Sequence, residues 1–265
     1  MSAKTVATWF GLIIIAVIVL FPIIWGLRTS FGPKSGSVEL IPPFKDNYSP
    51  LIGRGLSSYI KNSLIVALVT AIITLCIALP GGYALGRLDF PGKKFGILLV
   101  VFPLLPPTAL LVPLVTYMVK LGLYDTLYAV IIVNLVFNLP FAVWTLSSFI
   151  SSIPKELEEA AAIDGCTTAG IFFKIVLPLV SLGIITITMF VFITAWNNYL
   201  YAYALTQSPD VRVLPMTILA FMGQYGIDYG GLCAAGMLAL IPPIILFLVL
   251  QKHFVSGMTA GAVKG

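Results

Sequence analysis

Long apolar segments separated by short polar ones make up most of this 265-residue chain. A helix needs about 20 mainly apolar residues to cross the hydrocarbon core of a bilayer. Six segments are apolar over a comparable length, and their approximate ranges are 7–27, 62–85, 95–119, 126–150, 179–202 and 232–250. The pattern predicts an all-α polytopic membrane protein, with six transmembrane helices in a single domain that covers residues 1–265.

Two of these segments contain residues that interrupt helices. The Pro-Gly-Gly sequence at 80–82 predicts a kink or a close contact with another helix. The third segment contains Pro103, Pro106, Pro107 and Pro113, so we do not expect one straight helix there. Broken backbone at membrane depth is tolerated only where protein or a water-filled cavity satisfies its polar groups. The third segment is therefore either part of a pathway or a kinked packing helix.

Composition supports lipid as the solvent of this chain. Hydrophobic residues make up 59% and charged residues 9%, and the mean hydropathy is +1.05. Soluble domains carry about 25% charged residues, so this chain has too little polar surface for water. The net charge of +5 is scattered without a basic tract, which argues against a nucleic-acid partner. Cys76, Cys166 and Cys233 lack the spacing of a metal site and form no obvious disulfide, and we interpret them as packing residues.

One long segment in the middle of the chain, residues 154–178, is not a plausible membrane span. It carries four acidic residues, Glu156, Glu158, Glu159 and Asp164. Pro154 suits a first helical turn, and Gly165 can adopt the left-handed conformation that ends a helix. Thr167 or Thr168 can then cap a second helix, which Pro178 stops. The segment predicts two short helices joined by a turn, for which an interfacial amphipathic hairpin is the simplest interpretation.

The same segment resembles the EAA motif of ABC importer permeases, EAA-x3-G-x9-I-x-LP. Every defined position is filled, from Glu159 through Gly165 to Pro178. In that family the motif forms a cytoplasmic coupling helix that docks into a cleft of the ATPase subunit, and the fold is that of a type I ABC importer permease. The resemblance implies a role in ATPase coupling for Glu159, Ala160, Ala161, Asp164, Gly165, Ile175, Leu177 and Pro178.

The C-terminal residues resemble those of the carbohydrate-uptake permeases, particularly the shorter permease of maltose-type importers. In those relatives the tail, which corresponds here to 251–265, reaches the interface between the ATPase subunits. The resemblance implies the same contact for Gly257, Thr259, Ala260, Gly261 and Lys264. A frayed, glycine-rich terminus is the alternative interpretation.

A loop before the last apolar segment resembles the loop that enters the binding protein's cleft in maltose-type importers. The residues that would make this contact are Gln224, Tyr225, Gly226, Asp228 and Tyr229. Here the loop is short, and a plain interfacial turn with its tyrosines at the lipid headgroups is the alternative.

Polar and aromatic residues inside the spans are candidates for lining a solute path. Asn134 and Asn138 are four residues apart and therefore share a helix face. Trp196, Asn197 and Tyr199 lie near the far end of the fifth segment, where Trp196 and Tyr199 would share a face with Tyr203. Amides bind sugar hydroxyls and aromatic faces stack on sugar rings. Packing between helices and interfacial anchoring explain each residue equally well when it is taken alone.

Several classes of protein are disfavoured by what the sequence lacks. No Asp, Glu, Lys, Arg or His lies deep in a predicted span, although proton- and sodium-driven carriers usually need such a residue. The sequence contains no GxxxxGK[ST] phosphate loop, so we expect no ATPase site in this chain. An intramembrane serine protease would need a histidine at membrane depth, and the only histidine, His253, follows the last span. We therefore expect a transport subunit that takes its energy from another protein.

The resemblance also implies the partners of such a subunit. They are a second, similar permease, two ATPase subunits that bind ATP and magnesium, an extracytoplasmic solute-binding protein and a sugar. We expect no cofactor in this chain itself. An importer for another solute, such as glycerol phosphate, is the alternative, but an anion would favour basic residues in the pathway.

The expected location is the cytoplasmic membrane of a bacterium or archaeon. The expected topology places the basic residues almost equally on the two sides, so the positive-inside rule does not orient the chain. We place both termini in the cytoplasm because the coupling segment must face ATP.

Overall fold

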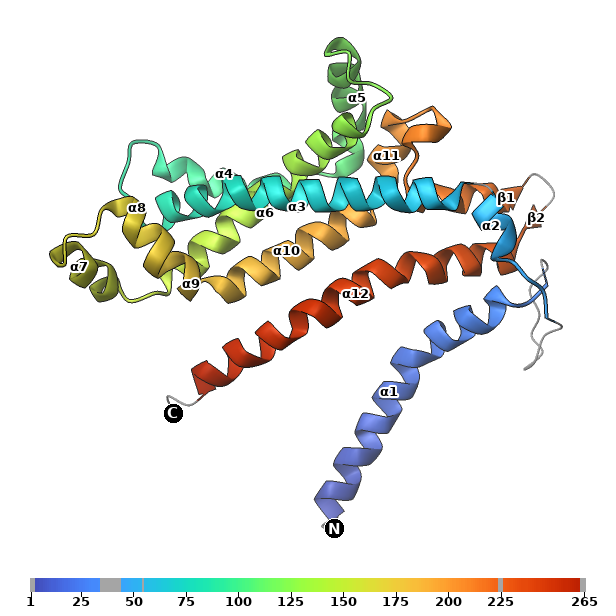
Figure 1. Ribbon diagram of the computed structural model, residues 1–265, viewed down its shortest axis with the longest axis horizontal. Coiled ribbons are helices and arrows are strands. Elements are labelled where there is room, and N and C mark those ends of the chain that lie inside the picture. The colour runs from blue at the N-terminus through green and yellow to red at the C-terminus, as the bar shows by residue number, and fades with distance from the viewer. Residues whose placement is uncertain (1–2, 34–43, 54, 224–225, 263–265) are drawn as a thin grey trace. The chain divides into compact units, whose positions relative to one another are not determined.

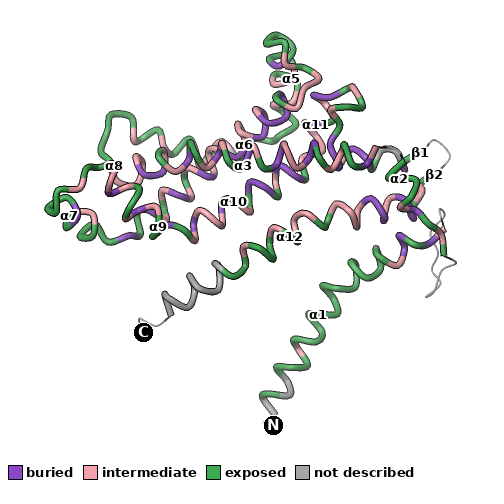
Figure 2. Tube along the Cα trace, in the orientation of Figure 1, coloured by how far each residue is buried: buried purple, intermediate pink, exposed green. Residues whose placement is uncertain are grey.

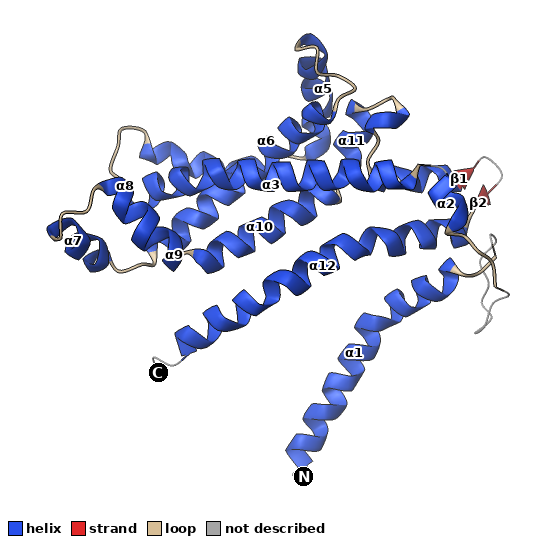
Figure 3. Ribbon diagram, in the orientation of Figure 1, coloured by secondary structure: helices blue, strands red, loops and turns tan. Residues whose placement is uncertain are grey.

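A computed structural model describes residues 3–33, 44–53, 55–223 and 226–262 of the chain. Most of these residues are helical (Figures 1 and 3). The four long helices are α1 (Ala3–Ser30), α3 (Leu56–Arg87), α6 (Leu127–Ser151) and α12 (Tyr229–Ala262). Each contains a stretch long and apolar enough to cross a membrane. The side chains of α1 are exposed along nearly all of its described length (Figure 2), as expected of a helix whose solvent is lipid or another membrane protein.

The chain divides into two compact units. The first contains 1–59 and 216–242, and the second contains 60–215 and 243–265. The first unit includes α1, α2 (Ser49–Gly53), the first part of α12 and a short antiparallel hairpin of β1 (Met222–Gly223) and β2 (Gly226–Ile227).

The beginning of α12 packs closely against the segment that follows α1. The Asn47 amide donates to the carbonyl oxygens of Ser30 at 2.9 Å and Gly32 at 2.8 Å. A Cβ atom on Gly230 would lie only 2.6 Å from both the Asn47 amide nitrogen and the Gly32 oxygen, so this approach requires glycine. Asp228 accepts a hydrogen bond from the Gly231 amide at 3.0 Å, which begins α12 directly after the hairpin.

In the second unit, α3 and α6 are in close contact through glycines. A Cβ atom on Gly82 would lie 3.0 Å from the Leu146 Cβ and 3.1 Å from the backbone nitrogen of Ser147. The close helix contact predicted for 80–82 is therefore confirmed, and α3 continues as one helix through Pro80. The fifth long segment contributes α10 (Ser181–Trp196), whose Gly183 approaches Phe149 of α6 in the same way.

The third apolar segment is not a continuous helix. It consists of five short pieces, η1 (Lys93–Ile97), α4 (Leu98–Val101), η2 (Phe102–Leu104), η3 (Pro107–Leu110) and α5 (Leu111–Lys120). The prolines predict that 95–119 is not one straight helix, and the structure confirms this. Consecutive prolines explain the break, because Pro106 and Pro107 have no backbone N–H to continue a helix and residue 106 is extended, with ψ of 126°. The Tyr201 hydroxyl donates to the exposed Pro107 carbonyl at 2.6 Å, which satisfies part of the broken backbone.

The expected helix over 179–202 is also broken. Helix α10 ends at Trp196, and after Asn197 and Asn198 the chain begins α11 (Tyr199–Leu205), which η5 (Pro209–Val211) and η6 (Leu214–Phe221) follow. Trp196 therefore does not share a helix face with Tyr199 and Tyr203, whose rings stack on each other with centroids 5.6 Å apart. A separate bend of 73° divides 168–179 from 181–196. The described residues therefore hold four apolar helices of spanning length, or five if this bent pair counts as one span.

At the C-terminal end, the helical backbone continues well beyond the expected end of the last span at residue 250. Helix α12 runs to Ala262, so a polar tail that begins at 251 is not separate from the helix. Gly257, Thr259, Ala260 and Gly261 lie within this helical backbone, and Lys264 is outside the described residues.

Asp125 joins two loops of the second unit. It has a left-handed backbone with φ of 61°, and its amide donates to the Leu205 carbonyl at 2.9 Å. Its carboxylate accepts hydrogen bonds from the Ser208 hydroxyl, from the Gln207 amide at 2.7 Å and from the Ser208 amide at 2.9 Å. These bonds, of which that from the Ser208 hydroxyl has the largest effect, lower the pKa of Asp125 below its ordinary value.

We expect the Asp125 contact to contribute a pH-dependent part of the stability. Because the folded-state pKa is lowered, the contribution is complete above the unfolded pKa of about 3.9 and is lost as the pH falls through the folded value. Thermal unfolding in detergent between pH 7 and pH 3 should show a steeper loss for the wild type than for Asp125→Asn, whose side chain does not titrate. Asp89→Asn, at an acid whose side chain is 97% exposed, should retain the wild-type profile. Identical profiles for the wild type and Asp125→Asn would contradict this assignment.

Candidate coupling element and pocket

The segment 154–178 forms two short helical parts joined by a turn, as the sequence predicts. Helix α7 (Lys155–Ile163) follows Pro154, and Gly165 has a left-handed φ of 83° in the turn. Thr167 caps α8 (Thr168–Ile171) by accepting a hydrogen bond from the Gly170 amide at 3.2 Å. A π-helical turn (Phe172–Val176) and α9 (Leu177–Leu179) complete the element. We call 154–179 the coupling element.

The coupling element packs on the ends of α3 and α6 that are nearest to it (Figure 1). The buried residues of this contact are Tyr83, Ile150, Ile153, Ala161, Ile171, Val176 and Val180. Ala161 is the motif residue of α7 that faces this cluster, and Ile175 packs against its edge. Leu177 is half-buried, so part of the motif serves to attach the element to the spans.

The remaining motif positions face outward. Glu159, Ala160, Asp164, Gly165 and Pro178 are exposed. Large apolar side chains are exposed beside them, with Ile163 at 87% and Phe173 at 63%. A surface that combines acids with large exposed apolar groups suits contact with another protein.

An ion pair attaches α7 to α3. The Arg87 Nε atom lies 2.6 Å from Oε1 of Glu158, and the two side chains are only 6% and 13% exposed. The Tyr83 hydroxyl donates to the second carboxylate oxygen, Oε2, at 3.1 Å. Arg87 also donates to the Ile153 carbonyl at 2.5 Å. Sequence reasoning missed this group, because it placed Arg87 in a hydrophilic turn and no local pattern pairs residues that lie so far apart in the chain.

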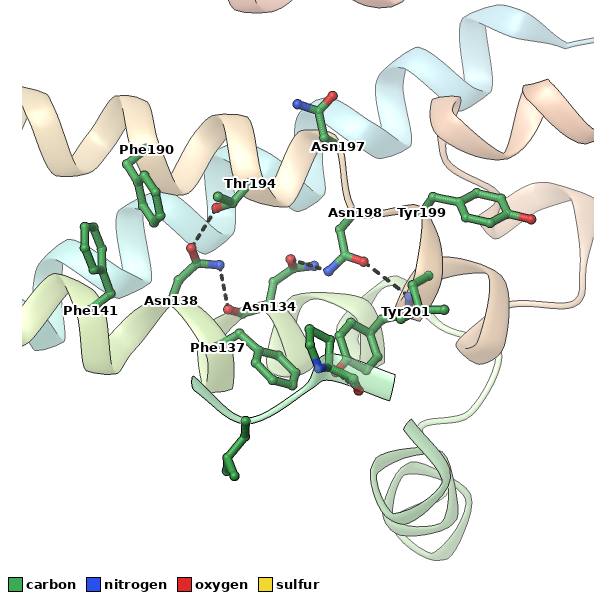
Figure 4. Close-up of a pocket in the computed structure, with 13 residues that line it drawn as sticks. Asn134, Phe137, Asn138, Phe141, Phe190, Thr194, Asn197, Asn198, Tyr199 and Tyr201 are labelled. Carbon is green, nitrogen blue, oxygen red and sulfur yellow. Dashed lines mark hydrogen bonds between the residues drawn. The ribbon is translucent and has the colours of Figure 1, made fainter. Parts of the chain in front are cut away.

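A pocket of about 530 Å³ lies where α6, α10 and α11 meet the broken third segment (Figure 4). Its lining residues are Leu105, Pro107, Asn134, Phe137, Asn138, Phe141, Phe190, Thr194, Asn197, Asn198, Tyr199, Leu200 and Tyr201. None of these residues is an acid, a lysine, an arginine or a histidine. An apolar pocket with a few polar groups is typical of a small-molecule site.

The polar side of the pocket is a chain of hydrogen-bonded amides. The Thr194 hydroxyl donates to Oδ1 of Asn138 at 2.7 Å, and Nδ2 of Asn138 donates to the Asn134 carbonyl at 2.8 Å. Asn198 donates to Oδ1 of Asn134 at 2.8 Å and accepts from the Tyr201 amide at 3.2 Å (Figure 4). Asn198 therefore both caps α11 and connects it to α6. We call these residues the amide ladder.

Aromatic rings form the other walls. Phe137 stacks on Tyr201 with ring centroids 4.8 Å apart, and the ring centroids of Phe141 and Phe190 are 4.3 Å apart. Because the Tyr201 hydroxyl is already bonded to the Pro107 carbonyl, the ring is held in position from both sides. The walls present flat apolar faces beside the amides, which is the combination that a sugar ring and its hydroxyls would require.

The structure brings together four of the five residues predicted to line a path. Asn134, Asn138, Asn197 and Tyr199 line the pocket, whereas Trp196 is 1% exposed and stacks on Phe192 with centroids 5.8 Å apart. Trp196 was misplaced because α10 ends there and the next residues turn away from its helix face. Sequence reasoning missed Thr194, Asn198, Phe137 and Tyr201, of which Asn198 could have been suspected from its helix-capping residue type.

Part of the predicted binding-protein loop is described. Gly226 lies in β2 and is exposed, Asp228 follows it, and Tyr229 begins α12 with its side chain 46% exposed. Gln224 and Tyr225 lie outside the described residues.

Comparison with known proteins identifies the family. The family described as "Binding-protein-dependent transport system inner membrane component" matches residues 78–260, which include the coupling element and the pocket residues from α6 to α11. The chain belongs to this family of ABC importer permeases.

Individual relatives transport sugars. The chain is 35% identical to the trehalose transport system permease protein SugB of Mycobacterium tuberculosis, over 100% of both chains. It is 33% identical to the diacetylchitobiose uptake system permease protein DasC of Streptomyces coelicolor, over 96% of this chain and 95% of that protein. In fold it is similar to a chain of a bacterial ABC transporter involved in the import of the acidic polysaccharide alginate, with a TM-score of 0.76 and 25% identity over 96% of this chain and 99% of that one.

Proposed function

We propose that this chain is the permease subunit of an importer for a neutral disaccharide or short oligosaccharide, and that the pocket is part of the solute path. The observation that carries the proposal is the lining of the pocket, in which amides and a hydroxyl stand beside aromatic faces without a charged side chain. Trehalose and diacetylchitobiose, the sugars named for two relatives, are neutral and rich in hydroxyl groups, like the solute proposed here.

The amide ladder suits passage better than tight binding. Its amides already have partners within the protein, so a sugar would exchange those hydrogen bonds for its own with little net gain. A solute must also leave its site for transport to continue, and weak, exchangeable contacts permit this. The second permease would complete the path and contribute further contacts.

The energy would come from partner ATPase subunits that bind ATP and magnesium. The outward-facing residues of the coupling element, among them Glu159 and Asp164, would dock into the ATPase, and this requires the element and both termini to be cytoplasmic. The C-terminal residues of α12 would contact the ATPase interface, and the segment around Asp228 would contact an extracytoplasmic solute-binding protein. This chain itself would hold neither nucleotide nor metal.

Helix α6 connects the two functional regions. Asn138 lines the pocket and Ile150 belongs to the cluster beneath the coupling element, and the twelve helical steps from one to the other span about 18 Å. Closure of the ATPase dimer would displace α7, and α6 would carry the displacement to the pocket, which then opens to the outside.

An anionic solute such as glycerol phosphate is the second candidate. It would require a cationic group in the path, which the described lining of this chain does not contain. The second permease would have to supply that group, so we favour a neutral sugar.

Cysteine accessibility in the assembled transporter tests whether the pocket is a path. In a background without Cys76, Cys166 and Cys233, Asn197→Cys and Tyr199→Cys should react with a membrane-impermeant maleimide after ATP and vanadate are added. Trp196→Cys is the matched control and should remain unlabelled, because residue 196 is 1% exposed. Trehalose, maltose or diacetylchitobiose should reduce the labelling if it is the solute. Absence of labelling at 197 and 199 in every nucleotide state would show that these are packing residues.

A further inference from the structure

The carboxylate of Glu158 is fixed by two residues of α3. Arg87 holds Oε1 at 2.6 Å and the Tyr83 hydroxyl holds Oε2 at 3.1 Å, so the carboxylate cannot rotate without breaking one of these bonds. Arg87 also donates to the carbonyl of Ile153, in the turn between α6 and α7. One arginine at the end of α3 therefore binds both α7 and the segment that leads into it.

Apolar packing alone would hold α7 less specifically. The buried apolar residue of α7 in this contact is Ala161, a small side chain that offers little resistance to rotation or sliding of the helix. The ion pair, in contrast, has a fixed direction and distance. At its other side, α3 is in close contact with α6 through Gly82 and Gly86, whose added Cβ atoms would lie 3.0 Å from Leu146 Cβ and 3.0 Å from the Ser147 carbonyl oxygen.

We propose that Arg87 and Glu158 are positioning residues for energy coupling. They make α7, α3 and α6 move as one body. A displacement of the coupling element then reaches the pocket, whereas without them α7 would shift relative to α3 and α6. Glu158 is distinct from Glu159 of the motif, because Glu158 faces the spans and Glu159 faces outward. The inference rests on the proposed function and adds the residues that transmit the movement within this chain.

A second ion pair near the same end of α3 provides a matched control. Lys93 and Asp89 are 3.1 Å apart, but their side chains are 39% and 97% exposed. Exposed pairs of this kind contribute little, because solvent screens them. Removal of Lys93 should therefore leave coupling unchanged, although it also removes a positive charge from this side of the protein.

The test uses the complete transporter in proteoliposomes and the double variant Arg87→Met with Glu158→Gln. Both charges are removed together because a single substitution would leave a buried charge without a partner and could prevent folding. The readouts are the amount of ATPase bound, vanadate trapping of nucleotide, and maleimide labelling of Tyr199→Cys from outside. We expect ATPase binding and trapping to persist, while labelling falls about tenfold, within the range typical of coupling between sites.

A single Arg87→Lys substitution, which keeps the charge, should restore part of the labelling, and Lys93→Met should label as the parent does. Wild-type labelling in the double variant would overturn the inference, and so would loss of ATPase binding, which would indicate a merely structural role. If Tyr199→Cys with Arg87 and Glu158 intact is never labelled, the proposed path itself fails and the inference fails with it. That outcome is distinguishable because it does not depend on the Arg87 variant.

Discussion

Glu159→Lys is expected to abolish stable binding of the ATPase subunit and to reduce solute uptake to background. Glu159 is exposed on α7 and takes no part in the buried cluster, so its replacement should leave insertion and folding intact. Reversal of a charge at the centre of a protein interface typically costs about 2–5 kcal/mol, enough to weaken binding by more than a factor of about 30.

Co-purification of the ATPase with the tagged permease from detergent-solubilised membranes measures this effect. Glu156→Lys is the matched control, because Glu156 is also an exposed acid of α7 but lies outside the motif. It should retain most of the bound ATPase. Stoichiometric ATPase with Glu159→Lys, together with uptake at the wild-type rate, would exclude α7 as the docking helix.

Gly82→Val is expected to destabilise the protein strongly. Its Cβ would lie 3.0 Å from Leu146 Cβ and 3.1 Å from the Ser147 backbone nitrogen, and a helix backbone cannot yield as a flexible side chain can. Separation of α3 from α6 would cost roughly 3 kcal/mol, the upper part of the usual range for overpacking.

The yield of monodisperse protein and its thermal unfolding in detergent measure this cost. Gly236→Val is a matched control, since it places the same residue in a helix where nothing lies within 4 Å of the added Cβ. A similar unfolding temperature for both variants would mean that the two helices are not held together at Gly82.

The parts of the fold that the sequence predicts well are those with local causes. Four long apolar helices follow from hydropathy, and the coupling element follows from its proline, glycine and threonine signals at fixed positions. The break between α10 and α11 has a weaker local signal, because Asn198 is a favoured helix-capping residue but asparagine also occurs inside helices, so the sequence alone does not decide that the chain turns there.

The candidate site was predictable to a similar extent. Asn134 and Asn138 could be found from their spacing of four residues, and both line the pocket. Their partners are Thr194 of α10 and Asn198, which caps α11, and both lie more than fifty residues away, so no local pattern in the sequence predicts the pairing. The same limit explains why Arg87 was not connected to Glu158.

Uptake in whole cells tests most directly whether this chain carries a neutral sugar across the membrane together with an ATPase and a binding protein. Uptake of radiolabelled trehalose, maltose and diacetylchitobiose should be measured in cells that lack only this chain, with and without a plasmid that restores it. We predict that at least one of these sugars enters only when the chain is restored, and that excess glycerol phosphate does not compete. Uptake of all three sugars at the same rate with and without the chain, accompanied by loss of glycerol phosphate uptake in its absence, would contradict a role in the import of a neutral sugar.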